Sequence, residues 1–84
     1  ARAIEYFEQS LAMSKQIYGD RPHHDLAASL TGLGNAYKVL GEHGRVIDYY
    51  QQALARLKEI YNEKPHLHVA ISLMNLGNAY YNLG

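Results

Sequence analysis

The feature that most constrains the fold of this chain is an internal repeat with a period of 43 residues. The segment "LTGLGNAYKVLG" at 30–41 returns as "LMNLGNAYYNLG" at 73–84. When the whole sequence is shifted by 43 positions, 21 of the 41 overlapping positions are identical without a gap. A fixed period of roughly 20 to 50 residues is typical of folds in which one supersecondary unit stacks on the next. The sequence therefore predicts an array of repeated units.

Each repeat contains two helical patterns of apolar residues. Positions 26, 30, 33, 37 and 40 are apolar, and their alternating steps of four and three place them on one face of a helix. Positions 69, 73, 76, 80 and 83 have the same spacing. The second pattern occupies residues 44–61 and has a more polar counterpart in residues 1–18, where Ser10 and Ser14 replace Ala53 and Leu57. No strand pattern competes with either, so the sequence predicts an all-α fold.

The breaks between these patterns give the order and direction of the helices. The segments "GDRPHH" (19–24) and "NEKPHL" (62–67) begin with Gly or Asn, which end a helix readily, and contain Pro, which prevents its continuation. The segment "GEH" (41–43) is so short that it must join antiparallel neighbours. Gly41 and Gly84 are the expected left-handed C-caps. We therefore predict helices over 1–18, 25–40, 44–61 and 67–83 in one array spanning 1–84.

Composition excludes several classes of function. The chain has 84 residues, a formal net charge of zero and no run of like charge, which argues against a nucleic-acid or anionic-membrane surface. It has no Cys, and therefore neither disulfides nor thiolate metal sites. No apolar run is long enough to span a bilayer, and no N-terminal signal pattern is present. We expect a cytoplasmic protein without a cofactor, unless a targeting segment lies outside this sequence.

Two glycines occupy positions in the middle of expected helices. Gly34 and Gly77 each cost a helix roughly 1 kcal/mol relative to Ala. Because glycine stands at both positions despite this cost, we predict a helix crossing that is too close for a side chain. Tyr37 and Tyr80 would fill the space one turn further on.

The pattern of these residues resembles the tetratricopeptide repeat. The matching positions are Leu30, Leu33, Gly34, Tyr37, Tyr50 and Ala53 in the complete unit, and Leu73, Leu76, Gly77 and Tyr80 in the next. The resemblance covers essentially the whole chain. It implies a right-handed solenoid of helical hairpins, in which 25–40 and 67–83 are A helices and 1–18 and 44–61 are B helices. The chain then has the order B-A-B-A and is part of a longer array.

The length of the repeat departs from the common family pattern. That pattern has a period of about 34 residues, whereas the period here is 43, and Lys58 stands where the shorter pattern closes with Pro. The longer repeat resembles those of kinesin light chains and related scaffold proteins.

The resemblance also implies that the A helices line a concave surface. Asn amides both donate and accept hydrogen bonds, so Asn residues on this surface are suited to holding the main chain of an extended peptide. Apolar neighbours would then select side chains, although the Asn residues could equally bond locally or face water. The residues predicted to form this groove are Thr31, Asn35, Lys38, Val39, Ile71, Met74, Asn75, Asn78, Tyr81 and Asn82, with Ala28 and Gly32 on the same face. The predicted function is a protein-interaction module that binds a peptide.

The sequence does not support three more specific kinds of site. A clamp for a terminal carboxylate needs cations, and the sequence has none at the matching positions. Five His residues suggest a metal site, but stacked helices lie roughly 8–10 Å apart, so residues 43 positions apart do not readily share one ion. Ser29 with His24 and Asp25 is a nominal catalytic set, yet no nucleophile elbow or phosphate loop accompanies it. We predict neither a metal site nor an enzyme.

A structural role is the main alternative to peptide binding. The chain begins with a B helix and ends with an A helix, so each end presents a surface that the opposite end would match. Copies could therefore stack head to tail through an open, heterologous contact, with a groove that binds nothing. The other explanation of these surfaces is that the chain is a piece of a longer array. Binding to single-stranded nucleic acid is a distant third possibility.

Overall fold

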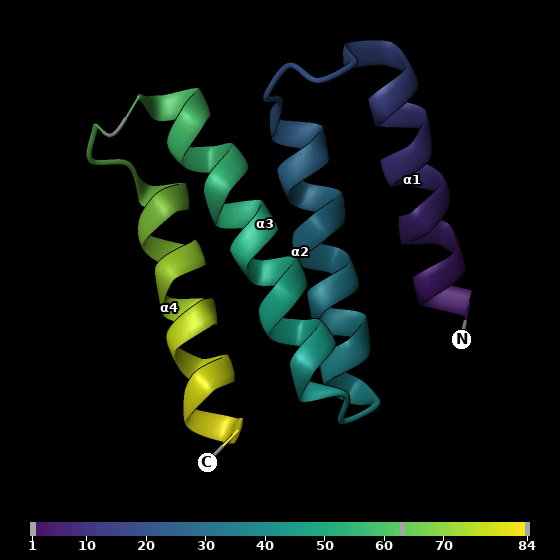
Figure 1. Ribbon diagram of the computed structural model, residues 1–84, viewed down its shortest axis with the longest axis vertical. Helices are drawn as coiled ribbons and strands as arrows, with labels where there is room; N and C mark the ends of the chain where they lie inside the picture. Colours follow the sequence, from purple (N-terminus) through teal and green to yellow (C-terminus); the bar gives the residue numbers. More distant parts are fainter. Residues whose placement is uncertain (1, 63, 84) are drawn as a thin grey trace.

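The computed structural model describes residues 2–62 and 64–83, which form four antiparallel helices. These are α1 (Arg2–Tyr18), α2 (His24–Val39), α3 (His43–Tyr61) and α4 (Leu67–Leu83). They lie side by side in a flat array with extents of 33 × 30 × 16 Å (Figure 1). Helices without strands across the described residues confirm the all-α prediction.

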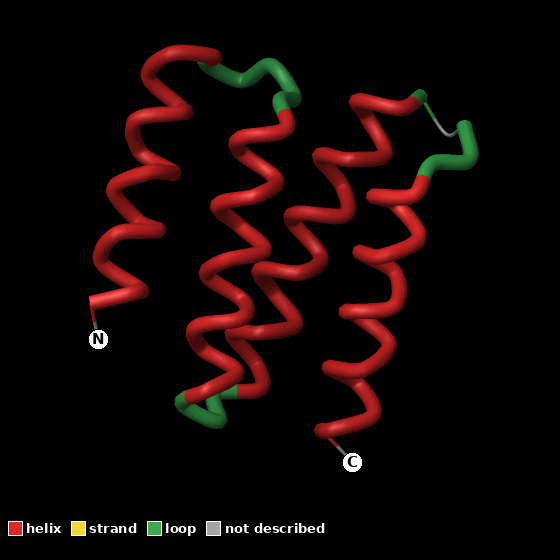
Figure 2. The backbone as a smooth tube through the Cα atoms, turned by 180° about the vertical axis from the view of Figure 1, so that it is seen from behind, coloured by secondary structure: helices red, strands yellow, loops and turns green. Residues whose placement is uncertain are grey.

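Left-handed residues end the helices where the sequence predicted breaks. Gly41 has φ of 75° and Gly19 has φ of 64°, a conformation in which a Cβ atom would be strained. Asn62 caps α3 in the same region, with φ of 52°. The expected cap at Gly84 lies outside the described residues. Figure 2 shows that the loops after α1 and α3 share one end of the molecule, and the turn after α2 lies at the other.

The two A helices, α2 and α4, begin with the same side-chain contact. Nδ1 of His23 accepts a hydrogen bond from the backbone N–H of Asp25 at 3.1 Å, and Nδ1 of His66 accepts one from His68 at 3.1 Å. A side chain that satisfies a free N–H group of the first turn acts as an N-cap. Because His23 supplies this cap, α2 begins at His24 rather than at residue 25.

The helices pack in the order in which they follow one another. α2 contacts α1 and α3, and α4 contacts α3; among the described residues, no other pair of helices brings Cα atoms within 8 Å. The centre of the fold is therefore the α2–α3 pair. Leu33 is completely buried there and Val46 nearly so. The buried residues that form the core cluster are Ile4, Leu33, Tyr37, Val46, Tyr50 and Ala79.

The two A helices differ in burial, although their sequences repeat. Leu30 and Tyr37 of α2 are buried, whereas their counterparts Leu73 and Tyr80 of α4 are each 49% exposed. The sequence predicted a core stripe in both helices. The difference arises because α2 packs between α1 and α3, whereas α4 packs on α3 alone among the described helices.

The glycines show the same asymmetry. A Cβ atom on Gly34 would lie 2.5 Å from Cε1 of Tyr50, which confirms a close crossing at this position. A Cβ atom on Gly77 would meet nothing within 4 Å, so the expectation does not hold there. Gly32, expected on the groove face, is buried, and a Cβ atom added there would overlap the ring of Phe7. α2 therefore has close crossings on both sides, with α1 at Gly32 and with α3 at Gly34.

Burial of Tyr50 gives the fold a predicted sensitivity to high pH. Burial raises the pKa of the Tyr50 hydroxyl above its ordinary value of 10.0. The unfolded chain therefore loses this proton at a lower pH than the folded one, so stability falls as the pH rises above about 10. We expect Tyr50→Phe to shift alkaline unfolding, followed by circular dichroism, to higher pH. Tyr81→Phe is the matched control, because Tyr81 is 85% exposed; equal shifts for both variants would contradict the prediction.

Candidate peptide-binding groove

An open groove of about 510 Å³ runs between the two A helices. Leu57 of α3 and Phe7 of α1 also contribute to it. The residues that line it are Phe7, His24, Asp25, Ala27, Ala28, Thr31, Gly32, Asn35, Leu57, His68, Ile71, Ser72 and Asn75. Asp25 is the one Asp or Glu among them, and no Lys or Arg of the described chain lines the groove.

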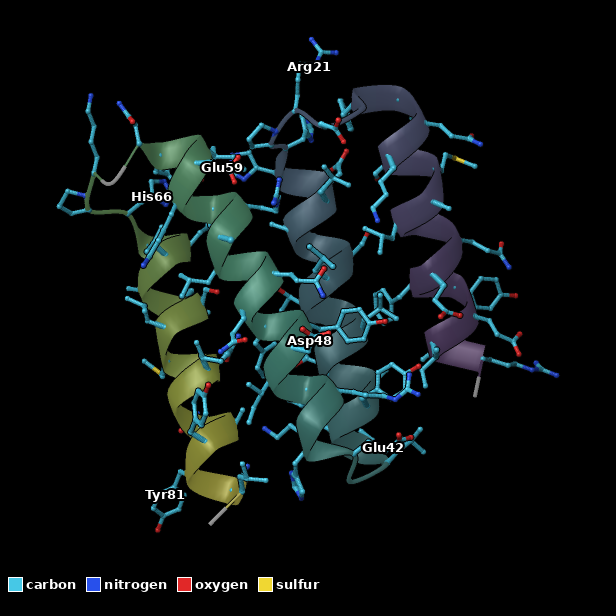
Figure 3. The ribbon with its side chains drawn as sticks, viewed as in Figure 1. Arg21, Glu42, Asp48, Glu59, His66 and Tyr81 are labelled. Carbon is cyan, nitrogen blue, oxygen red and sulfur yellow. The ribbon has the colours of Figure 1, made fainter. Side chains whose placement is uncertain are left out.

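The groove brings together only part of the set predicted from the sequence. Thr31 and Asn35 line it from α2, and Ile71 and Asn75 line it from α4. The remaining predicted residues do not line it, namely Lys38, Val39, Met74, Asn78, Tyr81 and Asn82. All of these are exposed. Figure 3 shows Tyr81 at the C-terminal end of α4, pointing away from the other helices.

Helical spacing explains why the amides of α4 divide in this way. Ile71, Asn75, Asn78 and Asn82 follow one another at steps of four, three and four, so they form one stripe along the helix. The first two members of this stripe line the cavity, and the last two do not. Asn78 and Asn82 therefore extend the same face beyond the groove, where they are exposed.

Asn35 is held in place by the core beneath it. Its Oδ1 atom accepts a hydrogen bond from the hydroxyl of Tyr50, which is itself buried. Its NH₂ group has no hydrogen-bond partner among the described residues, which leaves two donors available. Sequence reasoning missed this contact because the two residues lie on different helices, 15 positions apart.

A cluster of aromatic rings lies at one end of the groove, where His24 and His68 line it. The ring of Tyr61 stacks on that of His66 with centroids 3.6 Å apart, and its hydroxyl lies 3.2 Å from Nε2 of His24. The rings of His24 and His68, both lining the groove, have centroids 5.9 Å apart. The cluster thus joins the loop after α3 to the starts of both A helices. Figure 3 shows His66 at this end of the molecule.

The first repeat extends the ring cluster. The ring of Tyr18 stacks on His23 at 3.7 Å, and its hydroxyl donates a hydrogen bond to Oδ2 of Asp25 at 3.1 Å. This hydrogen bond is the main reason that the pKa of Tyr18 is raised above 10.0. From the sequence these His residues are expected to be loop residues at helix starts, and periodicity does not show that two such loops meet. Among the described residues, no group of three or more His, Asp or Glu side chains is arranged to hold a metal ion.

Comparisons with known proteins identify the repeat. The profile of a family described as Tetratricopeptide repeat matches residues 1–59, which include α1, α2 and most of α3. No curated protein and no solved structure matches the chain. No helix in the described part of the chain is both long enough and apolar enough to cross a membrane. The resemblance of the long repeat to those of kinesin light chains stays a prediction. The family match and the arrangement of the helices show that the chain belongs to the tetratricopeptide repeat family.

Proposed function

We propose that the chain is a protein-interaction module whose groove binds an extended peptide segment of a partner protein. Repeats of this family typically serve as non-catalytic interaction or scaffold modules, which supports the coarser part of the proposal. The observation that carries the finer part is the placing of Asn35 and Asn75 on facing walls of one open groove.

The groove walls suggest how a peptide would be held. The NH₂ group of Asn35 is available to a peptide carbonyl, and Asn75 can donate to or accept from the main chain on the opposite wall. Ile71 is 45% exposed and offers an apolar contact to a peptide side chain. The carboxylate of Asp25 at the ring-lined end favours a neutral or basic residue there. The expected ligand is therefore an uncharged or weakly basic extended peptide with an apolar side chain near Ile71.

A peptide-library selection with matched variants tests this proposal. We expect the unmodified chain to enrich a shared motif, and Asn75→Ala to bind that motif about two- to ten-fold more weakly, as the loss of one hydrogen bond implies. Ile71→Ser should weaken binding further because it removes an apolar contact. Asn82→Ala is the control, since Asn82 lies on the same stripe of α4 but outside the groove.

The selection should be run at micromolar or lower protein concentration on a sample shown to be helical by circular dichroism. No enrichment from such a sample would contradict the proposal. Equal losses for Asn75→Ala and Asn82→Ala would place binding on another surface. Asn35→Ala is a second variant, whose stability must be measured in parallel because Tyr50 depends on Asn35 for its hydrogen bond.

A further inference from the structure

We propose that the chain has a second binding site on the face opposite the groove, and that this site binds an acidic segment of a partner protein with an apolar side chain near the carboxylate. The site is a cavity of about 340 Å³ that α1, α2 and α3 line together. It shares no lining residue with the groove, so the inference does not depend on peptide binding there.

Helices of the chain bound this cavity on both sides. α1 and α3 each pack on α2, and among the described residues they bring no Cα atoms within 8 Å of each other. The space between them therefore has α2 beneath it, and Leu26 and Leu30 of α2 line it. Its volume falls within the range of about 300–1,000 Å³ that is common for ligand cavities. The opening lies between packed neighbours, and not at either end of the array.

The cavity and the groove lie on opposite sides of α2. Ala28 and Asn35 line the groove, whereas Leu26 and Leu30 line the cavity. Successive residues of a helix are turned by about 100°, so Leu30 lies about 200° around the helix from Ala28. A ligand in one of the two sites therefore leaves the other accessible.

The base of the cavity is apolar. Leu26 and Leu30 are each 5% exposed, and Leu11 of α1, which also lines the cavity, is half-buried. An apolar side chain that enters the cavity is removed from water, which is favourable in proportion to the area that it buries. The base therefore suits an aliphatic or aromatic side chain of a ligand.

Two cationic side chains line the walls of the cavity from different helices. Lys15 belongs to α1 and Arg56 to α3, and Lys15 forms no ion pair with any described residue. Arg56 pairs through Nη1 with Oε1 of Glu59 at 3.6 Å, and its side chain is 37% exposed. A guanidinium has five N–H donors, so others remain available. A carboxylate between Lys15 and Arg56 would accept charge-assisted hydrogen bonds from both.

Two carboxylates of the chain lie near these cations. Asp20 lines the cavity next to Gly19, the left-handed residue at the end of α1, and Glu59 pairs with Arg56. Figure 3 shows Glu59 on α3 at the end of the molecule where the loop after α1 lies. Among the lining residues two cations therefore face one carboxylate, which favours a ligand with a single negative charge. The groove has the opposite balance, since one carboxylate and no cation of the described chain line it.

A segment of a partner protein is the occupant that these features favour. An apolar base beside two cations matches a Glu or Asp side chain that has a Leu, Ile or Phe side chain close to it. The chain has a formal net charge of zero and no run of like charge, which disfavours nucleic acid and anionic membranes as ligands. The family to which the chain belongs also serves in protein interaction.

Fluorescence anisotropy with synthetic peptides tests the site. The probes are labelled peptides of Gly and Ser that contain one Glu and one Leu, either adjacent or one helical turn apart. Each has a version with Gln for Glu and a version with Ser for Leu. At an ionic strength of about 0.01 M, where screening is weak, we expect one Glu–Leu spacing to bind with a sub-millimolar Kd and both of its altered versions to bind more weakly. If no Glu–Leu probe binds better than both altered versions, the proposal is overturned.

Matched charge substitutions locate the binding of this probe. Lys15→Gln and Arg56→Gln should each weaken it about two- to five-fold, the loss expected for an exposed ion pair. Lys38→Gln is the control, because it removes the same charge from an exposed position that lines neither cavity. An equal loss for Lys38→Gln would indicate non-specific attraction and would overturn the proposal. Circular dichroism checks that every variant has the helicity of the unmodified chain.

Nuclear magnetic resonance gives an independent arm that needs no substitution. On titration with the Glu–Leu probe, we expect the backbone amide signals of Leu26, Leu30 and Arg56 to shift and those of Ile71 and Asn75 to stay in place. Shifts confined to Ile71 and Asn75 would place the probe in the groove and overturn the proposal. Vesicles of phosphatidylserine and phosphatidylcholine test the membrane as an occupant at about 0.15 M ionic strength. Vesicle binding that Lys15→Gln abolishes would overturn the assignment to a protein segment.

Discussion

Replacing Gly34 by Leu is expected to lower the free energy of unfolding by about 3 kcal/mol. The added Cβ atom alone would lie 2.5 Å from Cε1 of Tyr50, and leucine has three further carbon atoms beyond it. The ring cannot move aside cheaply, because it is 3% exposed and its hydroxyl is bonded to Asn35. The helices must therefore separate, and the contacts of the buried residues around them weaken.

The repeat provides the control for this substitution within the same molecule. Gly77→Leu makes the same change at the equivalent position, where nothing lies within 4 Å of the added Cβ. Because leucine favours a helix over glycine by up to about 1 kcal/mol, this variant should be slightly more stable than the unmodified chain. Urea unfolding followed by circular dichroism, at a concentration where the chain is monomeric, measures both. Equal effects at the two positions would show that the α2–α3 crossing does not require glycine.

Truncating Leu33 to Ala should cost about 2–5 kcal/mol. Leu33 is 0% exposed and lies in the core that α2 forms with its neighbours, so its removal leaves a cavity. A domain of this size has a total stability of about 4–13 kcal/mol. We expect the midpoint of thermal unfolding to fall sharply, with part of the helicity lost at 37 °C.

Leu73→Ala is the matched control for this truncation. Leu73 belongs to the same helical pattern in the second repeat, but it is 49% exposed because no described helix covers it. Its truncation should change stability by less than about 1 kcal/mol. A loss as large as that of Leu33→Ala would mean that the stripe on α4 is covered in solution, which in a dilute sample would contradict the packing described above.

The elements of the fold were predictable because they follow from local spacing. The steps of four and three, the left-handed residues Gly19, Gly41 and Asn62, and the short turn at 41–43 each act within a few residues. Burial was less predictable. The repeat gives Gly34 and Gly77 the same expectation, yet burial depends on which helix lies opposite, and periodicity does not contain that information. Gly32 lines the groove as expected, but its close approach to Phe7 of α1 was not predictable for the same reason.

The groove was predictable only in its position. Helical spacing places Asn35 and Asn75 on the faces that α2 and α4 turn toward each other, and both line the groove. Helical spacing also puts Asn78 and Asn82 on the same stripe of α4, although they do not line this cavity, and their part in binding stays a prediction. The contact of Tyr61 with His24 could not be inferred, because it depends on where the loop after α3 meets the start of α2.

The packing of each helix on its sequence neighbours also bears on how such a chain changes in length. No backbone contact in the described part joins α1 to α4, so the order of the helices along the array is their order along the chain (Figure 1). Unequal recombination between two related segments that lie 43 residues apart would delete or insert a whole unit. The new junction would reproduce an interface that already exists. Gain or loss of a whole repeat therefore keeps each helix beside neighbours of the same type, so that the array changes in length without requiring a new kind of interface.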